Sequence, residues 1–160
     1  MDVLAQLQIV GTVALAILLG GIIGVERELA VKPAGFRTHM LVSGASALLM
    51  KLGEVVAVYY KPEAAIHAVS VDPTRIIQAI VTGISFLGAG TIIRHRHTEG
   101  VEGLTTAASI LLSAAIGICV ALGQIVLAVG VTLLALAILL LMGYLERLLG
   151  RTRNGRLSRN

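Results

Sequence analysis

The sequence predicts an all-α integral membrane protein, a bundle of five transmembrane helices with the N-terminus outside and the C-terminus in the cytoplasm. Of its 160 residues, 56% are hydrophobic and 14% are charged, and the mean hydropathy is +0.91. Soluble domains are roughly 45–50% apolar and about 25% charged. The apolar residues also gather in five long runs, and a helix that crosses a bilayer needs about 20 of them.

The five runs are residues 3–25, 40–60, 76–93, 104–122 and 125–145. Residues 1–148 are therefore expected to form one transmembrane domain, and residues 149–160 a basic, disordered cytoplasmic tail. The second run is interrupted by Lys51 and Glu54. One helical turn apart, they could pair with each other, or the helix could end early and Lys51 reach outward to water.

The distribution of basic residues predicts the orientation. If the N-terminus is outside, ten basic residues lie on the inner side and only Lys61 and Arg75 on the outer side. Lys and Arg are enriched in cytoplasmic loops of membrane proteins. The net charge of +4 thus indicates topology and attraction to lipid headgroups, and nucleic acid is not an expected partner. The inner residues are Arg27, Lys32, Arg37, Arg94, Arg96, Arg147, Arg151, Arg153, Arg156 and Arg159.

Small residues indicate where helices could pack closely in lipid. They recur at helical spacing in the first, third and fourth runs, which we expect at the centre of the bundle, with the leucine-rich fifth run at its periphery. The stripe in the fourth run is also the surface expected to dock other membrane helices. The packing residues are Gly20, Gly24, Gly83, Gly88, Gly90, Ser109, Ser113 and Gly117.

The strongest candidate for a functional site is a polar cluster at the inner boundary, between the first two runs. Ionisable groups at a membrane boundary are costly and usually paired or functional. One interpretation is an ionic network that binds something, with Arg37 bridging to Glu26 or Glu28; the other is a set of charges that only fixes topology. The cluster comprises Glu26, Arg27, Glu28, Arg37, Thr38 and His39, and the nearby Arg94, Thr105 and Thr106 could join it.

A second cluster, Asp72 and Arg75, lies at the outer side. Asp72 precedes Pro73, a pattern typical of a helix N-cap, and Arg75 needs a partner such as Asp72 or Glu54. The single cysteine, Cys119, excludes an intrachain disulfide. The sequence has no His-Glu-x-x-His, Gly-x-Ser-x-Gly or Walker-type motif, so we expect no enzymatic activity.

Five stretches of the sequence resemble the MgtC/SapB family of bacterial inner-membrane proteins. The resemblance implies a five-helix domain in the bacterial inner membrane, linked to magnesium limitation, acid adaptation and survival inside host cells. It also implies a regulatory action on the proton-translocating ATP synthase rather than magnesium transport. The stretches are Gly-Gly-Ile-Ile-Gly-Val-Glu-Arg-Glu at 20–28, Lys-Pro-Ala-Gly-Phe-Arg-Thr-His at 32–39, Asp-Pro-Thr-Arg at 72–75, Gly-Ile-Ser-Phe-Leu-Gly-Ala-Gly-Thr-Ile-Ile-Arg at 83–94 and Gly-Leu-Thr-Thr-Ala-Ala-Ser at 103–109.

Two functions therefore follow from the sequence. The first is a regulatory membrane protein that binds other membrane proteins, with the lipid bilayer, the ATP synthase or further copies of itself as partners. The second is a magnesium, cation or small-solute transporter or channel lined by Glu26, Arg37, Asp72 and Arg75. No cofactor is expected; Mg²⁺ is the one candidate ion, since it is usually held by one or two carboxylates and waters, and no set of metal ligands can be assigned.

Overall fold

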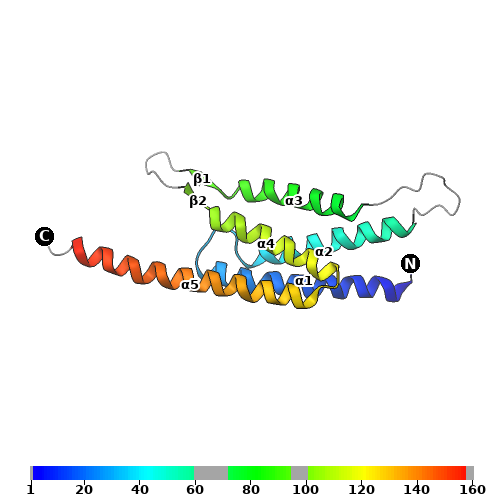
Figure 1. The fold of residues 1–160 in the computed structure, drawn as a ribbon, viewed down its shortest axis with the longest axis horizontal. Coiled ribbons are helices and arrows are strands. Elements are labelled where there is room, and N and C mark those ends of the chain that lie inside the picture. Colours follow the sequence, from blue (N-terminus) through cyan, green and yellow to red (C-terminus); the bar gives the residue numbers. More distant parts are fainter. Residues whose placement is uncertain (1, 60–71, 95–100, 158–160) are drawn as a thin grey trace.

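The computed structural model describes residues 2–59, 72–94 and 101–157. This part of the chain forms five helices that run side by side, which confirms the all-α class (Figure 1). Two short strands, β1 (Ile93–Arg94) and β2 (Val101–Glu102), pair in antiparallel fashion between α3 and α4. The helices are α1 (Val3–Leu29), α2 (Phe36–Tyr59), α3 (Pro73–Ala89), α4 (Leu104–Ala121) and α5 (Ile125–Leu157).

Four of these helices, α1, α2, α4 and α5, are long and apolar enough to cross a membrane. The helix α3 has 17 residues, which gives about 25 Å at a rise of about 1.5 Å per residue, less than the roughly 30 Å of a bilayer core. The predicted third span, 76–93, is therefore shifted: the helix begins at Pro73, ends at Ala89, and Ile93 belongs to β1. A fifth crossing by α3, like the orientation of the termini, stays a prediction.

Two other expectations about helix ends are corrected. The helix α2 does not end near Lys51: it continues to Tyr59, and Lys51 Nζ lies 2.9 Å from Glu54 Oε2, so the pairing alternative holds. The helix α5 continues to Leu157, so residues 149–157 of the expected disordered tail are helical, and residues 158–160 lie outside the described residues. Leucine and arginine, which are frequent after residue 146, are good helix formers and favour the extension despite Gly150 and Gly155.

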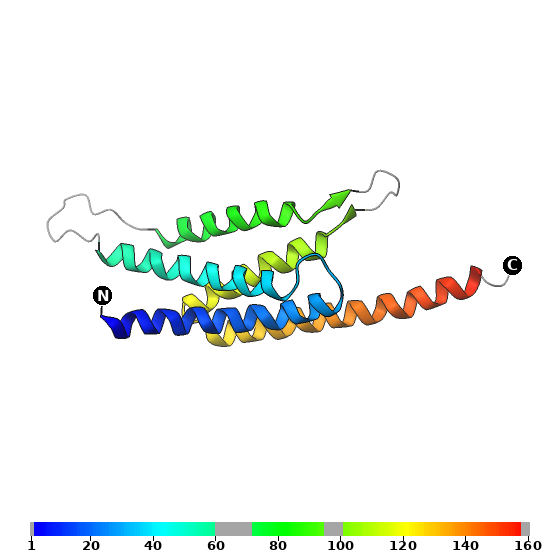
Figure 2. The same cartoon turned by 180° about the vertical axis from the view of Figure 1, so that it is seen from behind.

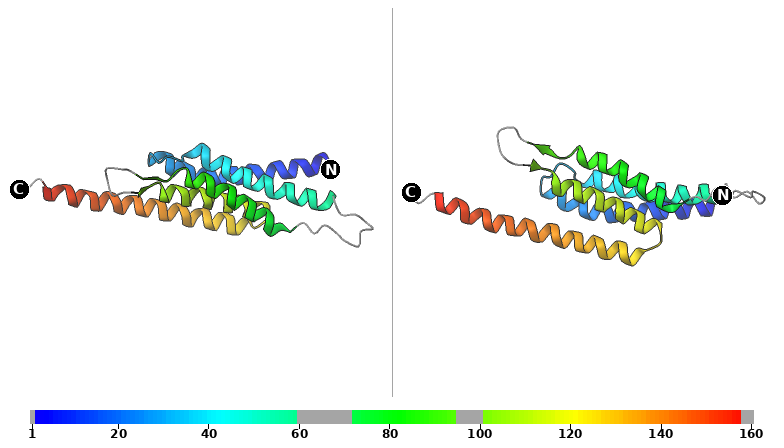
Figure 3. Two further views of the ribbon diagram at one scale, coloured as in Figure 1. Left: turned by 90° about the horizontal axis from the view of Figure 1, so that it is seen from above. Right: turned by 45° about the horizontal axis from the view of Figure 1, so that its top comes forward.

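The centre of the bundle consists of α1, α2 and α4, with α3 and α5 on opposite sides of it (Figures 2 and 3). The placement of α5 at the periphery agrees with the prediction, but the central position of α3 was wrong. Only Ile80 and Gly88 of α3 are buried, because its outer face carries no partner helix among the described residues. The helix α2 takes the central place. The innermost apolar side chains are Ala16, Ile23, Ala47, Met50, Ile116 and Val120.

Glycines allow the three central backbones to approach closely. A Cβ on Gly20 would lie 2.5 Å from the carbonyl oxygen of His39, and one on Gly24 would lie 2.6 Å from the Cα of Phe36, both on α2. On α4, a Cβ on Gly117 would overlap the backbone carbonyl of Ser43. Such contacts leave no room for a methyl group, so these three positions require glycine if the helices are to keep their spacing.

The glycines of α3 behave differently from the prediction. Gly88 packs against Ala107 of α4: a Cβ on Gly88 would lie 3.5 Å from the Cβ of Ala107. A Cβ on Gly83 would meet no atom within 4 Å, and one on Gly90 would approach only carbonyl oxygens of its own helix end. Gly83 and Gly90 are therefore not packing residues within this bundle; Gly90 is the C-cap of α3.

The two kinds of glycine give a matched pair of substitutions. Gly117→Ala should destabilise the protein by about 1–3 kcal/mol, because the added methyl group overpacks the contact with α2. Gly83→Ala adds the same methyl group in open space and should stabilise α3 by about 0.5–1 kcal/mol, because alanine restricts the unfolded chain more than glycine does. Thermal unfolding in detergent, followed by circular dichroism, measures both. Equal effects of the two substitutions would contradict the packing described here.

Candidate functional site

The C-terminal end of α1 and the N-terminal ends of α2 and α4 meet at one end of the bundle, hereafter the basic end. A short connection joins α1 to α2, and in it Val31 adopts a φ of 53°, a left-handed conformation that is uncommon for a β-branched residue. The backbone N–H of Lys32 donates to the carbonyl of Arg27 at 3.0 Å. The turn thus holds Lys32 close to the end of α1.

A chain of buried polar side chains connects the three central helices at this end. His39 of α2 is fully buried, and its Nε2 lies 3.1 Å from Ser109 Oγ on α4. Arg27 of α1 is 4% exposed, and its Nη2 donates to Thr106 Oγ1 of α4 at 3.3 Å. Ser109 Oγ in turn donates to the carbonyl of Thr106 at 2.9 Å. We call Arg27, His39, Thr106 and Ser109 the polar chain.

The contacts of His39 fix the tautomer of its neutral ring. Its Nδ1 lies 2.8 Å from the carbonyl oxygen of Gly35, and since a carbonyl can only accept, Nδ1 must carry a proton. In the neutral ring Nε2 is then an acceptor. The single hydroxyl proton of Ser109 can be donated either to Nε2 or to the carbonyl of Thr106, so the two contacts of that hydroxyl compete.

Arg27 and Glu26 are only loosely paired. Arg27 Nη1 lies 3.8 Å from Glu26 Oε2, and the two side chains are 4% and 11% exposed. Neither Glu26 Oε2 nor Arg27 Nε has a hydrogen-bond partner in the described part of the chain. Buried polar atoms are rarely left without a partner. Protein atoms cover both of these, so a bound group would reach them only after a movement of the side chains.

Beside this pair lies a cavity of about 380 Å³, which we call the basic-end cavity. One wall is polar and comes from the end of α1, the following turn and the start of α4; the other wall is apolar and comes from α5. The residues that line it are Glu26, Arg27, Ala30, Lys32, Thr105, Ile138, Leu139, Met142 and Gly143.

The predicted bridge from Arg37 to Glu26 or Glu28 was wrong. Arg37 is exposed and forms no ion pair among the described residues. The carboxylate of Glu28 instead accepts the backbone N–H of Phe36, at 2.9 Å, at the start of α2. An acidic group at a helix N-terminus satisfies a free donor and complements the helix dipole, so Glu28 stabilises the beginning of α2. The buried arginine of the cluster is Arg27.

The remaining residues that were predicted for this end differ in their burial and their contacts. Thr38 is half-buried and Thr105 exposed, and Thr105 faces the cavity rather than a neighbouring helix. The backbone of Arg94 belongs to β1, and its side chain lies outside the described residues. Ser113 is fully buried and its hydroxyl has no partner in the described part of the chain.

At the opposite end of the molecule, Asp72 is the N-cap of α3, as predicted. It accepts from the backbone N–H of Thr74 at 2.9 Å and from its hydroxyl at 2.7 Å, and these two hydrogen bonds lower the pKa of the Asp72 carboxyl below its ordinary value. The predicted ion pair of Arg75 with Asp72 or Glu54 is not formed: Arg75 is exposed, and Glu54 pairs with Lys51.

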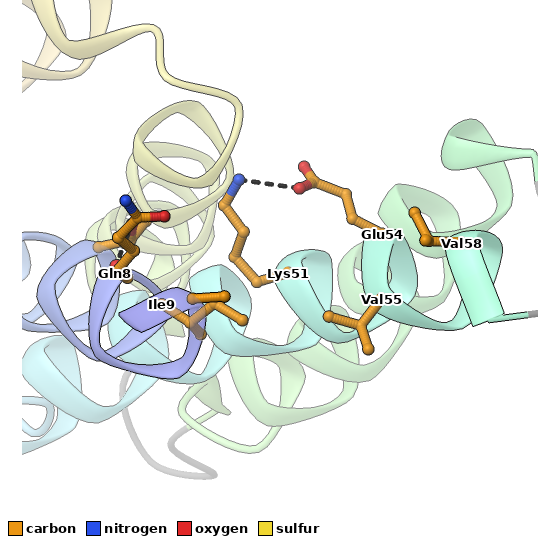
Figure 4. A pocket seen from close by; sticks show the side chains of 8 residues that line it. Gln8, Ile9, Lys51, Glu54, Val55 and Val58 are labelled. Atoms are coloured by element: carbon orange, nitrogen blue, oxygen red, sulfur yellow. Dashed lines mark hydrogen bonds and ion pairs between the residues drawn. The ribbon is translucent and has the colours of Figure 1, made fainter. Parts of the chain in front are cut away.

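The Lys51–Glu54 pair borders two cavities that the sequence did not indicate. The first, of about 400 Å³, lies between α1 and α2, with Gln8 and Thr12 on the α1 side (Figure 4). The second, of about 430 Å³, extends from Thr12 to the α4–α5 turn. Besides the Lys51 and Glu54 interruption of the second run, the polar residues Gln8 and Thr12, four apart in the first run, are the signal for this site.

No group of three or more potential metal ligands occurs among the residues that the structure describes. Each of these three cavities is bordered by one glutamate and by at least one basic side chain. The arrangement therefore suits the binding of charged or dipolar groups better than the direct chelation of a divalent cation, which prefers several oxygen ligands.

These features define a multi-pass helical membrane protein with a closely packed centre and a polar chain at one end. The MgtC family model matches residues 13–148, and the chain belongs to this family. No solved structure gives a significant match to the chain.

Curated relatives support the same assignment. The chain is 39% identical over 123 residues to MgtC of Salmonella typhimurium (strain LT2), covering 76% of this chain and 46% of that protein. It is 38% identical over 126 residues to YhiD of Escherichia coli (strain K12), whose name describes it as a candidate magnesium transporter, covering 78% and 56%. It is 35% identical over 109 residues to SapB of Bacillus subtilis, covering 68% and 45%. The chain spans about half the length of these relatives.

The different burial of Arg27 and Arg37 leads to a test. Arg27→Ala should lower the stability by about 1–3 kcal/mol, because it leaves Thr106 and Glu26 buried with fewer partners. Arg37→Ala removes an exposed charge and should change the stability by about 0–1 kcal/mol. Thermal unfolding of the purified protein in detergent compares the two. A larger loss from Arg37→Ala would contradict the geometry of the polar chain.

Proposed function

We propose that this protein is a non-enzymatic regulator in the bacterial inner membrane that acts by binding other membrane proteins. In this proposal it serves the adaptation to low magnesium or acid stress that the family resemblance implies. The N-terminus faces outward and the basic end faces the cytoplasm, in accord with the excess of basic residues there.

The observation that carries the proposal is the outer face of α3. It combines polar side chains with small residues at positions three and four apart, which share one side of a helix. All are exposed, and Phe86 among them is 85% exposed. The outer face comprises Gln78, Thr82, Ser85 and Phe86, and it is flanked by Ala79 and Gly83, which border a cavity between α3 and α2.

Such a face is poorly suited to lipid and well suited to another helix. The hydroxyls of Thr82 and Ser85 donate to carbonyls four residues back in α3, at 2.8 and 2.7 Å, whereas the Gln78 side-chain amide makes no hydrogen bond within the described part of the chain. Small residues allow a second helix to approach, and an amide can bond across the contact. The stripe of Ser109, Ser113 and Gly117, expected to serve this purpose, is buried inside the bundle.

A photo-crosslinking residue at position 82 tests the proposal in intact membranes. The expected product is an adduct with a membrane protein, and the proton-translocating ATP synthase is the first partner to examine because of the family resemblance. The matched control is the same probe at Leu133 of α5, a position that is 59% exposed in a purely aliphatic setting. Lipid adducts alone at both positions would refute docking through α3.

Transport is the second candidate function, favoured by the polar cavities at both ends and by the name of YhiD. The apolar side chains between them are fully buried, Ile23 and Ile116 at 0%, and they separate the Lys51 cavities from the basic-end cavity. This dense centre argues against a polar path through a single copy.

Flux of Mg²⁺ into liposomes that contain the purified protein distinguishes the two functions. We expect flux no greater than that of protein-free liposomes, and no change with Glu26→Gln. Flux that depends on the protein and falls with Glu26→Gln would establish the transport function in place of the regulatory one.

A further inference from the structure

The basic-end cavity has the chemistry of a binding site that the function proposed above does not use. Its charged wall contains a buried arginine whose hydrogen-bonding capacity is not filled. Arg27 has five N–H donors, of which one bonds Thr106 at 3.3 Å and another lies 3.8 Å from Glu26, while Nε has no partner among the described residues. The side chain is more than nine-tenths buried, so bulk water does not supply the missing bonds.

The start of α4 adds further donors to the same wall. Its N-cap is Gly103, which has no side chain and so leaves the first backbone N–H groups of α4 without a side-chain cap. Free N–H groups and the helix dipole make a helix N-terminus attractive to anions. Thr105, in this first turn, lines the cavity together with Arg27 and Lys32, so three sources of positive potential converge there.

The same cavity also contains an acceptor that needs a donor. Glu26 lines it with a side chain that is 11% exposed, and its covered oxygen, Oε2, has no hydrogen-bond partner in the described residues. The ionisable side chains of the wall are two basic ones, Arg27 and Lys32, and one acidic one, Glu26. The wall therefore carries one positive charge in excess. A simple anion would be repelled by Glu26, whereas a group that carries both a phosphate and an ammonium would satisfy both kinds of atom.

The opposite wall indicates where such a group would come from. Ile138, Leu139 and Met142 of α5 line the cavity, and they lie near the end of the apolar segment Ile125–Leu145. The cavity therefore sits where lipid headgroups meet the hydrocarbon. Its volume of about 380 Å³ is many times the roughly 30 Å³ of a water molecule.

We propose that the basic-end cavity binds the headgroup of an aminophospholipid. The phosphate lies against Arg27, Lys32 and the start of α4, the ammonium lies against Glu26, and the acyl chains follow the apolar wall of α5. Basic pockets beside membrane helices bind lipid headgroups in other proteins; here the acidic residue selects a headgroup with a primary ammonium.

Lipid binding to the full chain in detergent tests the proposal, with native mass spectrometry and thermal unfolding as readouts. Phosphatidylethanolamine should be retained and should raise the melting temperature more than phosphatidylglycerol with the same acyl chains, which lacks the ammonium. Free O-phosphoethanolamine at the same concentration should have little effect. Full stabilisation by O-phosphoethanolamine would replace the lipid by a soluble ligand, and no retained lipid would mean that the cavity holds water only; either result overturns the proposal.

Two substitutions separate this site from general attraction to lipid. Lys32→Gln should weaken phosphatidylethanolamine binding by about fivefold or more, because it removes a charge-assisted contact with the phosphate. Arg37→Gln is the matched control, since it removes an exposed charge at the same end but outside the cavity, and it should weaken binding by less than about twofold. Equal effects of the two substitutions would show a diffuse surface effect and overturn the proposal.

Glu26→Gln provides the test of headgroup selection. It should abolish the preference for phosphatidylethanolamine over phosphatidylglycerol while binding of phosphatidylglycerol persists, because only the ammonium contact is removed. An unchanged preference would overturn the role of Glu26. Circular dichroism of each variant establishes that it is folded before binding is compared, and no conclusion depends on Arg27, whose replacement destabilises the bundle.

Discussion

The close contact of α2 with both α1 and α4 is the constraint on which the rest of the structure depends. Apolar side chains gain little from helix association in lipid, so packing and hydrogen bonds must provide the attraction. Gly20, Gly24 and Gly117 remove the side chains that would hold the backbones apart. The resulting distance lets Ser43 of α2 donate to the carbonyl of Ala16 on α1 at 2.8 Å, and it brings His39 within reach of Ser109.

The polar chain follows from this packing and in turn limits what the basic end can do. Because α1 is held against α2, Arg27 faces α4 and not water, and its charge is buried with an incomplete set of partners. A buried charge without a good partner is destabilising. Thr106 and Glu26 offset only part of the cost of burying the Arg27 charge. Such an incompletely paired group makes the protein's stability sensitive to whatever occupies the neighbouring cavity.

The sequence predicted the helices well, because long apolar runs have no other stable conformation in lipid, but it did not predict their neighbours. Gly83 and Gly117 look alike in sequence, and only Gly117 has a partner backbone within contact distance. Arg27 and Arg37 both flank the same turn, and the rotation of α1 fixed by Gly20 and Gly24 decides which of them is buried. The end of α3 at Ala89 is followed by the pairing of β1 with β2, a contact between segments that no local pattern reveals.

The two ends of the bundle differ in a way that bears on function. At one end Lys51 and Glu54 form an ion pair at 2.9 Å. This pair is partly exposed to solvent, and it borders the cavities at that end. At the other end Arg27 is buried and only partly bonded, whereas Lys32 and Arg37 are exposed. Tightly packed apolar side chains such as Ile23 and Ile116 separate the two ends. The helix α3 buries only two residues, Ile80 and Gly88, so a partner bound to it would alter the bundle with little loss of packing.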